Sequence, residues 1–244
     1  MAFLHLRSYA ITDIGKKRSC NEDSVLALPG FGLFCVADGM GGLKSGDLAS
    51  KCITDFLRDV FETALRDERR DLESLVRTAL ERANCFLLDF ARKNNISGAG
   101  STAVVLTFDP DDRSRAEVFH AGDSRAYRLR SDKIEQLTAD HSVASIFNLR
   151  DTASLSPFFR SLITNAIGLD ATVELDHSSV DVQTNDLFLL CSDGLTKMLK
   201  DDTIMGIVND TNNDSLSESA HALVDAANDA GGADNIGVVL VEVS

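Results

Sequence analysis

The sequence has few prolines, no long apolar run and a shortage of basic residues. Its three prolines, with no internal repeat and no low-complexity tract, mark no linker, so we expect one domain over residues 1–244, although length alone also allows two small ones. No apolar run approaches the length of a membrane span, so we expect no membrane insertion. The net charge of −14 argues against binding to nucleic acid or to an anionic membrane, because both need a basic surface.

The sequence also lacks a disulfide pattern and a secretory signal. Its five cysteines are odd in number and widely spaced, and they contain no Cys-x-x-Cys. Three lie in apolar stretches, where a free cysteine behaves as a small hydrophobic residue. Residues 1–7 have no basic head followed by an apolar stretch and a cleavage site. These features predict a reducing, cytoplasmic location.

Hydrophobic periodicity predicts the secondary structure. Four-residue apolar spacing predicts long helices over 46–65 and about 72–90, and shorter ones near 201–209 and 216–230. No pattern assigns 140–170. Short apolar or alternating runs predict strands at 3–11, 24–28, 32–37, 101–108, 115–121, 124–130, 133–137, 173–182, 186–191 and 236–243. Because several strands follow one another without intervening helices, an α+β sandwich fits better than a doubly wound sheet.

Four short motifs place an aspartate beside glycine or another small residue. Their aspartates are Asp38, Asp123, Asp193 and Asp234. Such a corner leaves the carboxylate uncovered and lets the backbone turn sharply. Each motif alone is better explained as a simple turn than as a metal ligand. If the four converge, however, they form an all-oxygen pocket of the kind that Mg²⁺ or Mn²⁺ requires. That arrangement favours metal-assisted hydrolysis over thiolate or redox chemistry.

A site for two cations needs one carboxylate that bridges them, further oxygens and open positions. Asp38 is the natural bridge, because the carbonyl of Gly39 beside it can bind one ion with no side chain in the way. Gly41 and Gly42 would leave the loop bare for a phosphate. The carboxylates of the last two motifs, Asp193 and Asp234, would complete the set of ligands around the second ion.

Other catalytic interpretations fail on particular residues. Cys52 and Arg58 have the Cys-x5-Arg spacing of thiolate phosphatases, but they lie in a predicted helix without a glycine-rich loop. Residues 39–45 lack the glycine that precedes lysine in a P-loop. Residues 109–120 lack the glycine and the closing glutamate of a calcium loop. The five histidines show no ligand spacing, and we expect structural or surface roles for them, with His141 holding its turn.

The four motifs belong to a longer series of stretches that occur in order from about residue 10 to 243. The chain thereby resembles the metal-dependent serine/threonine protein phosphatases, the PPM family (protein phosphatase type 2C), and especially its small bacterial members. The resemblance implies a central antiparallel β-sandwich flanked by pairs of α-helices, in α-β-β-α layers. The matching stretches are 13–24, 36–42, 100–103, 121–125, 137–142, 191–195 and 231–235.

The resemblance implies a role for each site residue. Asp38 would bridge two tightly bound Mn²⁺ or Mg²⁺ ions, and the Gly39 carbonyl would bind the first. Asp193 and Asp234 would bind the second ion. Asp123 would help to hold a third, weaker ion seen in bacterial relatives.

Two further residues are implied on the substrate side. Arg18 would bind the substrate phosphate, which suits a guanidinium group, and Asp23 would orient metal-bound water. The implied reaction is direct attack by a metal-bridging hydroxide on phosphoserine or phosphothreonine, without a phosphoenzyme. Met40 stands where animal relatives carry a histidine that could protonate the leaving group, so a proton would have to come from water. Residues 143–160, which correspond to a flap in relatives, follow an unusual pattern.

The implied partners are phosphorylated proteins, including a cognate serine/threonine kinase and its targets, and we expect a monomer. Two alternatives remain open at this point. One is a pseudophosphatase that binds phosphoproteins without turnover, although such relatives lose metal carboxylates that this chain retains. The other is an enzyme of a partner-switching system, acting on a phosphorylated anti-sigma antagonist.

Overall fold

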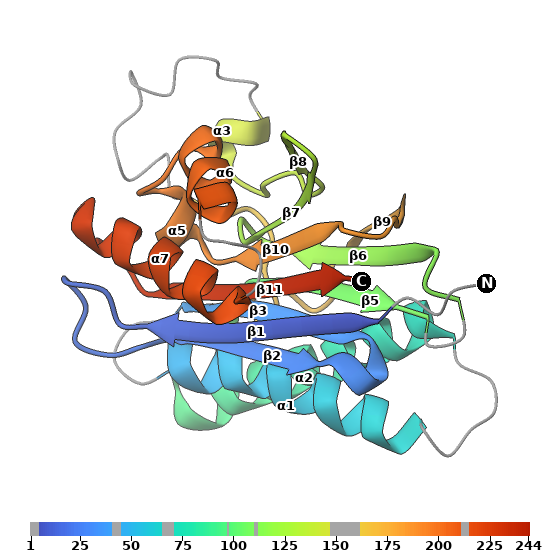
Figure 1. Cartoon of the computed structure of the whole chain (residues 1–244). Helices are drawn as coiled ribbons and strands as arrows, with labels where there is room; N and C mark the ends of the chain where they lie inside the picture. The colour runs from blue at the N-terminus through green and yellow to red at the C-terminus, as the bar shows by residue number, and fades with distance from the viewer. Residues whose placement is uncertain are drawn as a thin grey trace.

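Two antiparallel β-sheets lie face to face at the centre of the computed structural model (Figure 1), which describes residues 5–40, 45–64, 71–96, 98–109, 112–146, 162–210 and 215–244. The first sheet has the order β1 (Leu6–Asp13), β11 (Ile236–Val243), β10 (Leu187–Cys191), β7 (Arg125–Arg130) and β8 (Lys133–Gln136). The second has the order β2 (Asp23–Leu28), β3 (Leu33–Met40), β5 (Ala103–Phe108), β6 (Arg115–Ala121) and β9 (Asp176–Asp181), and β4 (Gly100–Ser101) also pairs with β3.

Helices cover both outer faces of the sandwich. Figure 1 shows α1 (Gly46–Ala64) and α2 (Leu72–Asn94) together on one side. On the opposite side lie α5 (Asp193–Thr196), α6 (Asp201–Asp210) and α7 (Leu216–Asp229). Short helical turns also occur at η1 (Pro29–Phe31) and α3 (Val143–Ile146). The predicted α+β sandwich with flanking helices is confirmed.

The central strands are apolar on both faces because each face is covered. In β3, Phe34 and Val36 lie in the core between the two sheets, whereas Leu33, Cys35 and Ala37 lie in the core beneath α1 and α2. Side chains of a strand alternate between its faces. A strand with a helix layer on one side and a sheet on the other therefore reads as a continuous apolar run and not as an alternating one.

The first sheet is built in the same way. Phe188 of β10 enters the core between the sheets, where its ring lies edge-on to Phe108 of β5 with 5.5 Å between centroids. Its neighbours Leu189 and Cys191 face α5–α7. Aromatic pairs of this geometry are favourable beyond the area they bury, so they help to hold the two sheets in register.

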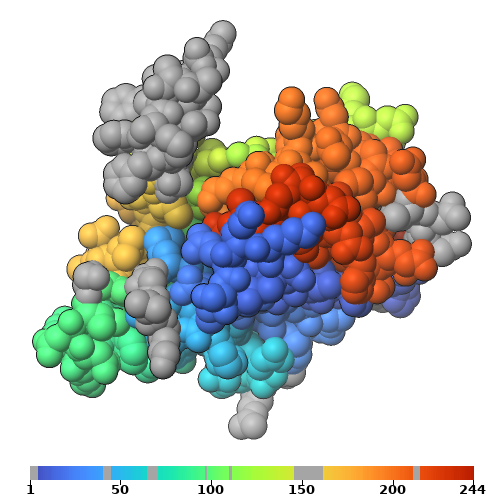
Figure 2. All heavy atoms as spheres, turned by 90° about the vertical axis from the view of Figure 1, so that its left-hand side faces the viewer, coloured from blue at the N-terminus to red at the C-terminus, as the bar shows by residue number. Residues whose placement is uncertain are grey.

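The two ends of the chain lie together. β1 pairs with β11 along its whole length, from Leu6 opposite Val243 to Asp13 opposite Ile236. In Figure 2 the blue N-terminal segment lies directly against the red C-terminal segment. This pairing places the 14–22 segment beside the start of β11, which is one wall of the site described below.

Most predicted elements match the structure to within a few residues. β1 continues to Asp13, β9 is shorter than predicted, and η1, β4 and α5 were not predicted. Within segment 140–170, which no sequence pattern assigned, the described residues include the short helix α3. Residues 147–161 lie outside the described residues. So do residues 3 and 4 of the first predicted strand and the two glycines predicted to leave the loop bare, Gly41 and Gly42. None of the helices in the described ranges is long and apolar enough to cross a membrane. All five cysteines are free.

Candidate active site

The predicted carboxylates meet at one end of the sandwich because strand ends and starts from both sheets converge there. Asp38 lies near the end of β3 and is directly opposite Asp23, the first residue of β2. Asp193 follows β10, and Asp234 precedes β11, with which β10 pairs. Asp123 follows β6. Antiparallel pairing and the packing of the two sheets thus bring together residues more than two hundred positions apart in the sequence.

The hydroxyl groups of Thr102 and Ser124 form a hydrogen-bond network that holds the backbone at Asp38. The Asp38 amide donates to Thr102 Oγ1 at 3.0 Å, and the Thr102 amide donates back to the Asp38 carbonyl at 2.9 Å. Thr102 Oγ1 also lies 2.7 Å from Ser124 Oγ, next to Asp123. All three side chains are buried or nearly so. This network couples the corner after β3 to the corner after β6.

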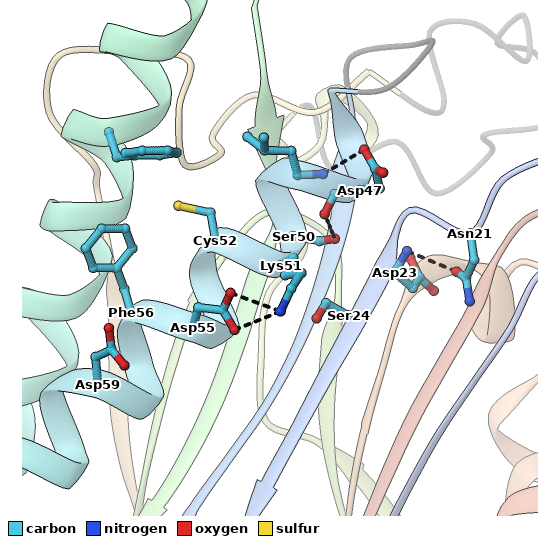
Figure 3. Close-up of a pocket in the computed structure, with 12 residues that line it drawn as sticks. Asn21, Asp23, Ser24, Asp47, Ser50, Lys51, Cys52, Asp55, Phe56 and Asp59 are labelled. Atoms are coloured by element: carbon cyan, nitrogen blue, oxygen red, sulfur yellow. Dashed lines mark hydrogen bonds and ion pairs between the residues drawn. The ribbon is translucent and has the colours of Figure 1, made fainter.

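Asp23 is held by a second buried hydroxyl group. Ser192 Oγ donates to Asp23 Oδ2 at 2.6 Å and accepts the Gly237 amide at 2.8 Å. On its other side, the Asp23 amide donates to Asn21 Oδ1 at 3.1 Å, as Figure 3 shows. Ser192 thereby joins the second sheet, which carries Asp23, to the first sheet, which carries Gly237. The carboxylate has a fixed orientation before any ligand binds.

Asn235 fastens the wall that carries Arg18. Its side-chain amide donates to the carbonyls of Ile14 (2.9 Å) and Cys20 (3.0 Å), and its Oδ1 accepts the Glu22 amide at 2.8 Å. These three contacts use both N–H donors and the oxygen of the amide group. They fold the 14–22 segment over the start of β11 and bring Arg18 into the site.

Two cationic side chains enter the cluster. Arg18 donates from a terminal guanidinium nitrogen to Asp234 Oδ2 at 2.8 Å. Lys197 Nζ contacts Asp193 Oδ2 and lies 3.7 Å from Asp234 Oδ2. The hydrogen bond to Asp234 raises the pKa of Arg18, which remains charged. The two cations offset part of the negative charge of the five aspartates.

Two close backbone contacts explain the glycines beside these aspartates. A Cβ on Gly39 would lie 2.0 Å from the Gly46 carbonyl oxygen, and one on Gly194 would lie 1.9 Å from the Asn235 carbonyl oxygen. Neither position has room for a side chain. The glycines therefore let the loops after β3 and β10 approach their neighbours closely enough to bring the aspartates together.

Burial and mutual repulsion raise the pKa values of the clustered carboxyl groups. Burial raises the pKa of Asp23 to about 7 against the hydrogen bond from Ser192, and repulsion by Asp193 adds to the effect of burial. Burial and then Asp193 raise the pKa of Asp123 to about 7. The pKa of Asp38 lies well above its ordinary value, again through burial first and then repulsion by Asp23. Without a cation, part of the cluster therefore stays protonated at neutral pH.

The donor set fits a divalent cation. Within the cluster, three carboxylate oxygens are buried without a hydrogen-bond partner among the described residues: Asp23 Oδ1, Asp123 Oδ1 and Asp193 Oδ1. Leaving such oxygens buried and unpaired is unfavourable. Oxygen ligands without sulfur or nitrogen suit Mg²⁺ and Mn²⁺. The cluster therefore matches the type of metal site that the sequence predicts.

A cavity lies beside this cluster, along α1. It has a volume of about 620 Å³ and reaches from Asp23 and Asn21 to Phe56 (Figure 3). Asp47, Asp55 and Asp59 also line it, and its Lys51 is paired with Asp55 at 3.0 Å. Negative charge therefore dominates the lining of this cavity, which disfavours the binding of an anion there.

Comparisons with known proteins identify the family. The chain matches the protein phosphatase 2C family over residues 15–231. The chain belongs to this family. It is 34% identical over 242 residues to the serine/threonine phosphatase stp of Listeria welshimeri, covering 95% of this chain and 93% of that protein. It is 32% identical over 243 residues to the protein phosphatase PhpP of Streptococcus pneumoniae, covering 96% of each.

Solved structures with a similar fold are also bacterial phosphatases. The structure of PppA of Pseudomonas aeruginosa has a TM-score of 0.85 and 32% identity, with 98% of each chain covered. The catalytic domain of the phosphatase PstP, solved in complex with two manganese ions, has a TM-score of 0.83 and 32% identity, with 98% of this chain and 99% of that chain covered. The present protein phosphatase 2C is thus a serine/threonine phosphatase of the bacterial type.

In this protein phosphatase 2C, the interpretation of Cys52 as a nucleophile is excluded by its surroundings. Cys52 is buried within α1, and burial raises the pKa of its thiol to about 12. A nucleophilic cysteine needs the opposite shift. It serves as a core residue beneath α2.

One cluster of possible metal ligands lies outside the predicted residues. His120, His141 and Asp176 place one ligand atom each within 4.8 Å of one another. His141 Nδ1, however, accepts the Gly122 amide at 3.2 Å, so in the neutral ring the proton is on Nε2, which faces Asp176 at 3.4 Å. Neither ring nitrogen of His141 has a free lone pair. The histidine instead holds the loop that contains Asp123.

Four residues of the site were not predicted from the sequence: Thr102, Ser192, Asn235 and Lys197. The first three lie inside the motifs that carry the resemblance, but nothing in the sequence shows which backbone groups their side chains reach. Lys197 follows Asp193 by four residues, a spacing that brings two helical side chains together. That spacing was the available signal for its contact with Asp193.

Proposed function

We propose that the carboxylate cluster holds two tightly bound Mn²⁺ or Mg²⁺ ions, and that the enzyme uses them to hydrolyse phosphoserine and phosphothreonine in proteins. The observation that carries the proposal is the set of buried, unpaired oxygens on Asp23, Asp123 and Asp193 at one end of the sandwich. The raised pKa values of Asp23 and Asp123 support it, because a cation relieves the repulsion that raises them. The manganese complex of PstP is further support.

The proposed ligands are the residues implied by the family motifs. Asp38 would be the ligand common to both ions, the Gly39 carbonyl would be a further ligand of the first, and Asp193 and Asp234 would be ligands of the second. Asp123 is the ligand proposed for a third, weaker ion. When bound, the ions activate a water molecule as the nucleophile and neutralise charge on the phosphate.

The remaining roles belong to side chains that are already positioned. Arg18 reaches the cluster from the 14–22 segment and would exchange its contact with Asp234 for the substrate phosphate. Asp23, fixed by Ser192, accepts a hydrogen bond from the attacking water and orients it. Met40 has no exchangeable proton, so the proton for the leaving alkoxide comes from water.

The biological setting follows from this chemistry. We propose that the whole chain acts as one catalytic domain, monomeric and cytoplasmic, and that it opposes a serine/threonine kinase by dephosphorylating that kinase and its targets. The retained carboxylates argue against a pseudophosphatase, because such relatives lose metal ligands whereas Asp38, Asp193 and Asp234 are all present here and lie together.

The test compares metal-free and Mn²⁺-loaded protein on two substrates, a phosphothreonine peptide and an aryl phosphate. We expect hydrolysis of both with Mn²⁺ and none after EDTA treatment. Asp193→Ala and Asp234→Ala are expected to abolish turnover while the protein stays folded by circular dichroism. Full activity of the metal-stripped enzyme, or a phosphoenzyme trapped by acid quench, would disprove the proposal.

A further inference from the structure

Lys197 places a positive charge inside the proposed metal site. It follows directly after α5 and, four residues beyond Asp193, lies on the same side of that helical turn. Its ammonium group contacts Asp193 Oδ2 and lies 3.7 Å from Asp234 Oδ2. Burial lowers the pKa of Lys197, but the attraction of Asp193 and other carboxylates outweighs it and the pKa is raised. The lysine therefore stays charged.

The ammonium group uses oxygens that a cation would need. Asp193 Oδ2 contacts Lys197, whereas Asp193 Oδ1 is buried and unpaired. Asp234 Oδ2 is shared by Arg18 at 2.8 Å and Lys197 at 3.7 Å, while Asp234 Oδ1 accepts the Asn235 amide at 2.9 Å. The Lys197 ammonium group and a metal ion bound to the same oxygen atoms would repel one another strongly at these distances.

We propose that Lys197 is an internal counter-ion that neutralises Asp193 and Asp234 in the metal-free protein and competes with the metal for them. The inference rests on the metal-binding role proposed above for these two aspartates. Its consequence is a weaker metal affinity than the carboxylates alone would have, together with a more stable metal-free protein. The two effects are linked, because whatever stabilises the metal-free state opposes loading.

The structure provides a place for the displaced ammonium group. Lys197 lines a cavity of about 430 Å³ that it shares with Asp123 and Asp193. Its side chain is 40% exposed, so it can turn into this cavity without disturbing the core. Asp123 attracts Lys197 already and has one unpaired carboxylate oxygen. A lysine released from Asp193 therefore remains near a carboxylate.

The test measures Mn²⁺ binding by calorimetry on EDTA-stripped protein. Lys197→Met keeps the length of the side chain and removes its charge, and Lys200→Met, at an exposed position three residues further on, is the control for net charge. We expect Lys197→Met to bind Mn²⁺ roughly tenfold more tightly than wild type, as the loss of a partly exposed charge-assisted contact implies. Lys200→Met is expected to bind as wild type does.

Thermal unfolding gives a second readout that does not depend on activity. The metal-free Lys197→Met protein is expected to melt at a lower temperature than metal-free wild type, and to gain more from Mn²⁺. If it does not fold without metal, Lys197→Gln, which keeps a hydrogen-bond donor but no charge, is measured in its place. An unchanged Mn²⁺ affinity in both neutral variants overturns the inference. Failure of wild type to bind Mn²⁺ at all instead overturns the proposed metal site.

Discussion

Removing the hydroxyl group of Ser192 tests the contact that joins the two sheets at the active site. Ser192 is fully buried, and its Oγ serves both Asp23 Oδ2 and the Gly237 amide. In Ser192→Ala both groups lose this partner at a fully buried position. An unsatisfied buried group costs about 1–3 kcal/mol, so two of them are expected to lower the free energy of unfolding by about 3 kcal/mol. For a chain of this size, that is a fall in Tm of roughly 6–12 °C.

Ser50→Ala is the matched control. Ser50 is equally buried, but its hydroxyl group only donates to the Asp47 carbonyl within α1, at 3.3 Å. We expect a loss of about 1 kcal/mol or less, because no charged group is left unpaired. Both variants are measured by thermal and urea unfolding in EDTA. Equal losses in the two variants would refute the argument that Ser192 satisfies two buried groups across the sheets.

Three further predictions follow from the site. Arg18→Ala should lower kcat/KM by roughly ten- to a hundredfold without weakening Mn²⁺ binding in calorimetry, because it removes phosphate contacts and not a metal ligand; a loss of Mn²⁺ binding would contradict this. Asp123→Ala should reduce kcat more on the phosphothreonine peptide than on the aryl phosphate, whose leaving group needs little protonation, and should leave the two tight ions bound; equal reductions would exclude a role in leaving-group protonation. In EDTA, stability should fall as pH rises from about 4 to 7, because carboxyl groups such as Asp23 and Asp123, with pKa values of about 7 in the fold against about 4 when unfolded, are disfavoured as anions. The fall should be smaller in Asp123→Asn and absent with Mn²⁺, as Tm measured against pH will show.

The elements of the fold were predictable because they depend on local patterns. The stripe of Val76, Ala79, Leu80, Ala83 and Leu87 on α2 has helical spacing and is fully buried, as its periodicity predicts. The short, continuous apolar run before Asp38 is likewise a local pattern, and it predicts a buried strand. The order of strands in each sheet was not predictable, since no local pattern shows that β1 lies beside β11. That choice depends on contacts between residues far apart in the chain.

The same division applies to the active site. The sequence by itself determined which aspartates lie at uncovered corners, since an aspartate beside glycine at a strand end is a local feature, and together with the family resemblance it indicated the phosphatase chemistry. Only the tertiary structure placed Asp23 opposite Asp38 and Ser192 beside Gly237, because strand register is set by the packing of the whole sandwich. It alone also brought Asp234 to the pair of Asp193 and Lys197, whose contact the four-residue spacing could indicate. Contacts between residues far apart in the chain depend on three-dimensional proximity, which spacing along the chain does not specify.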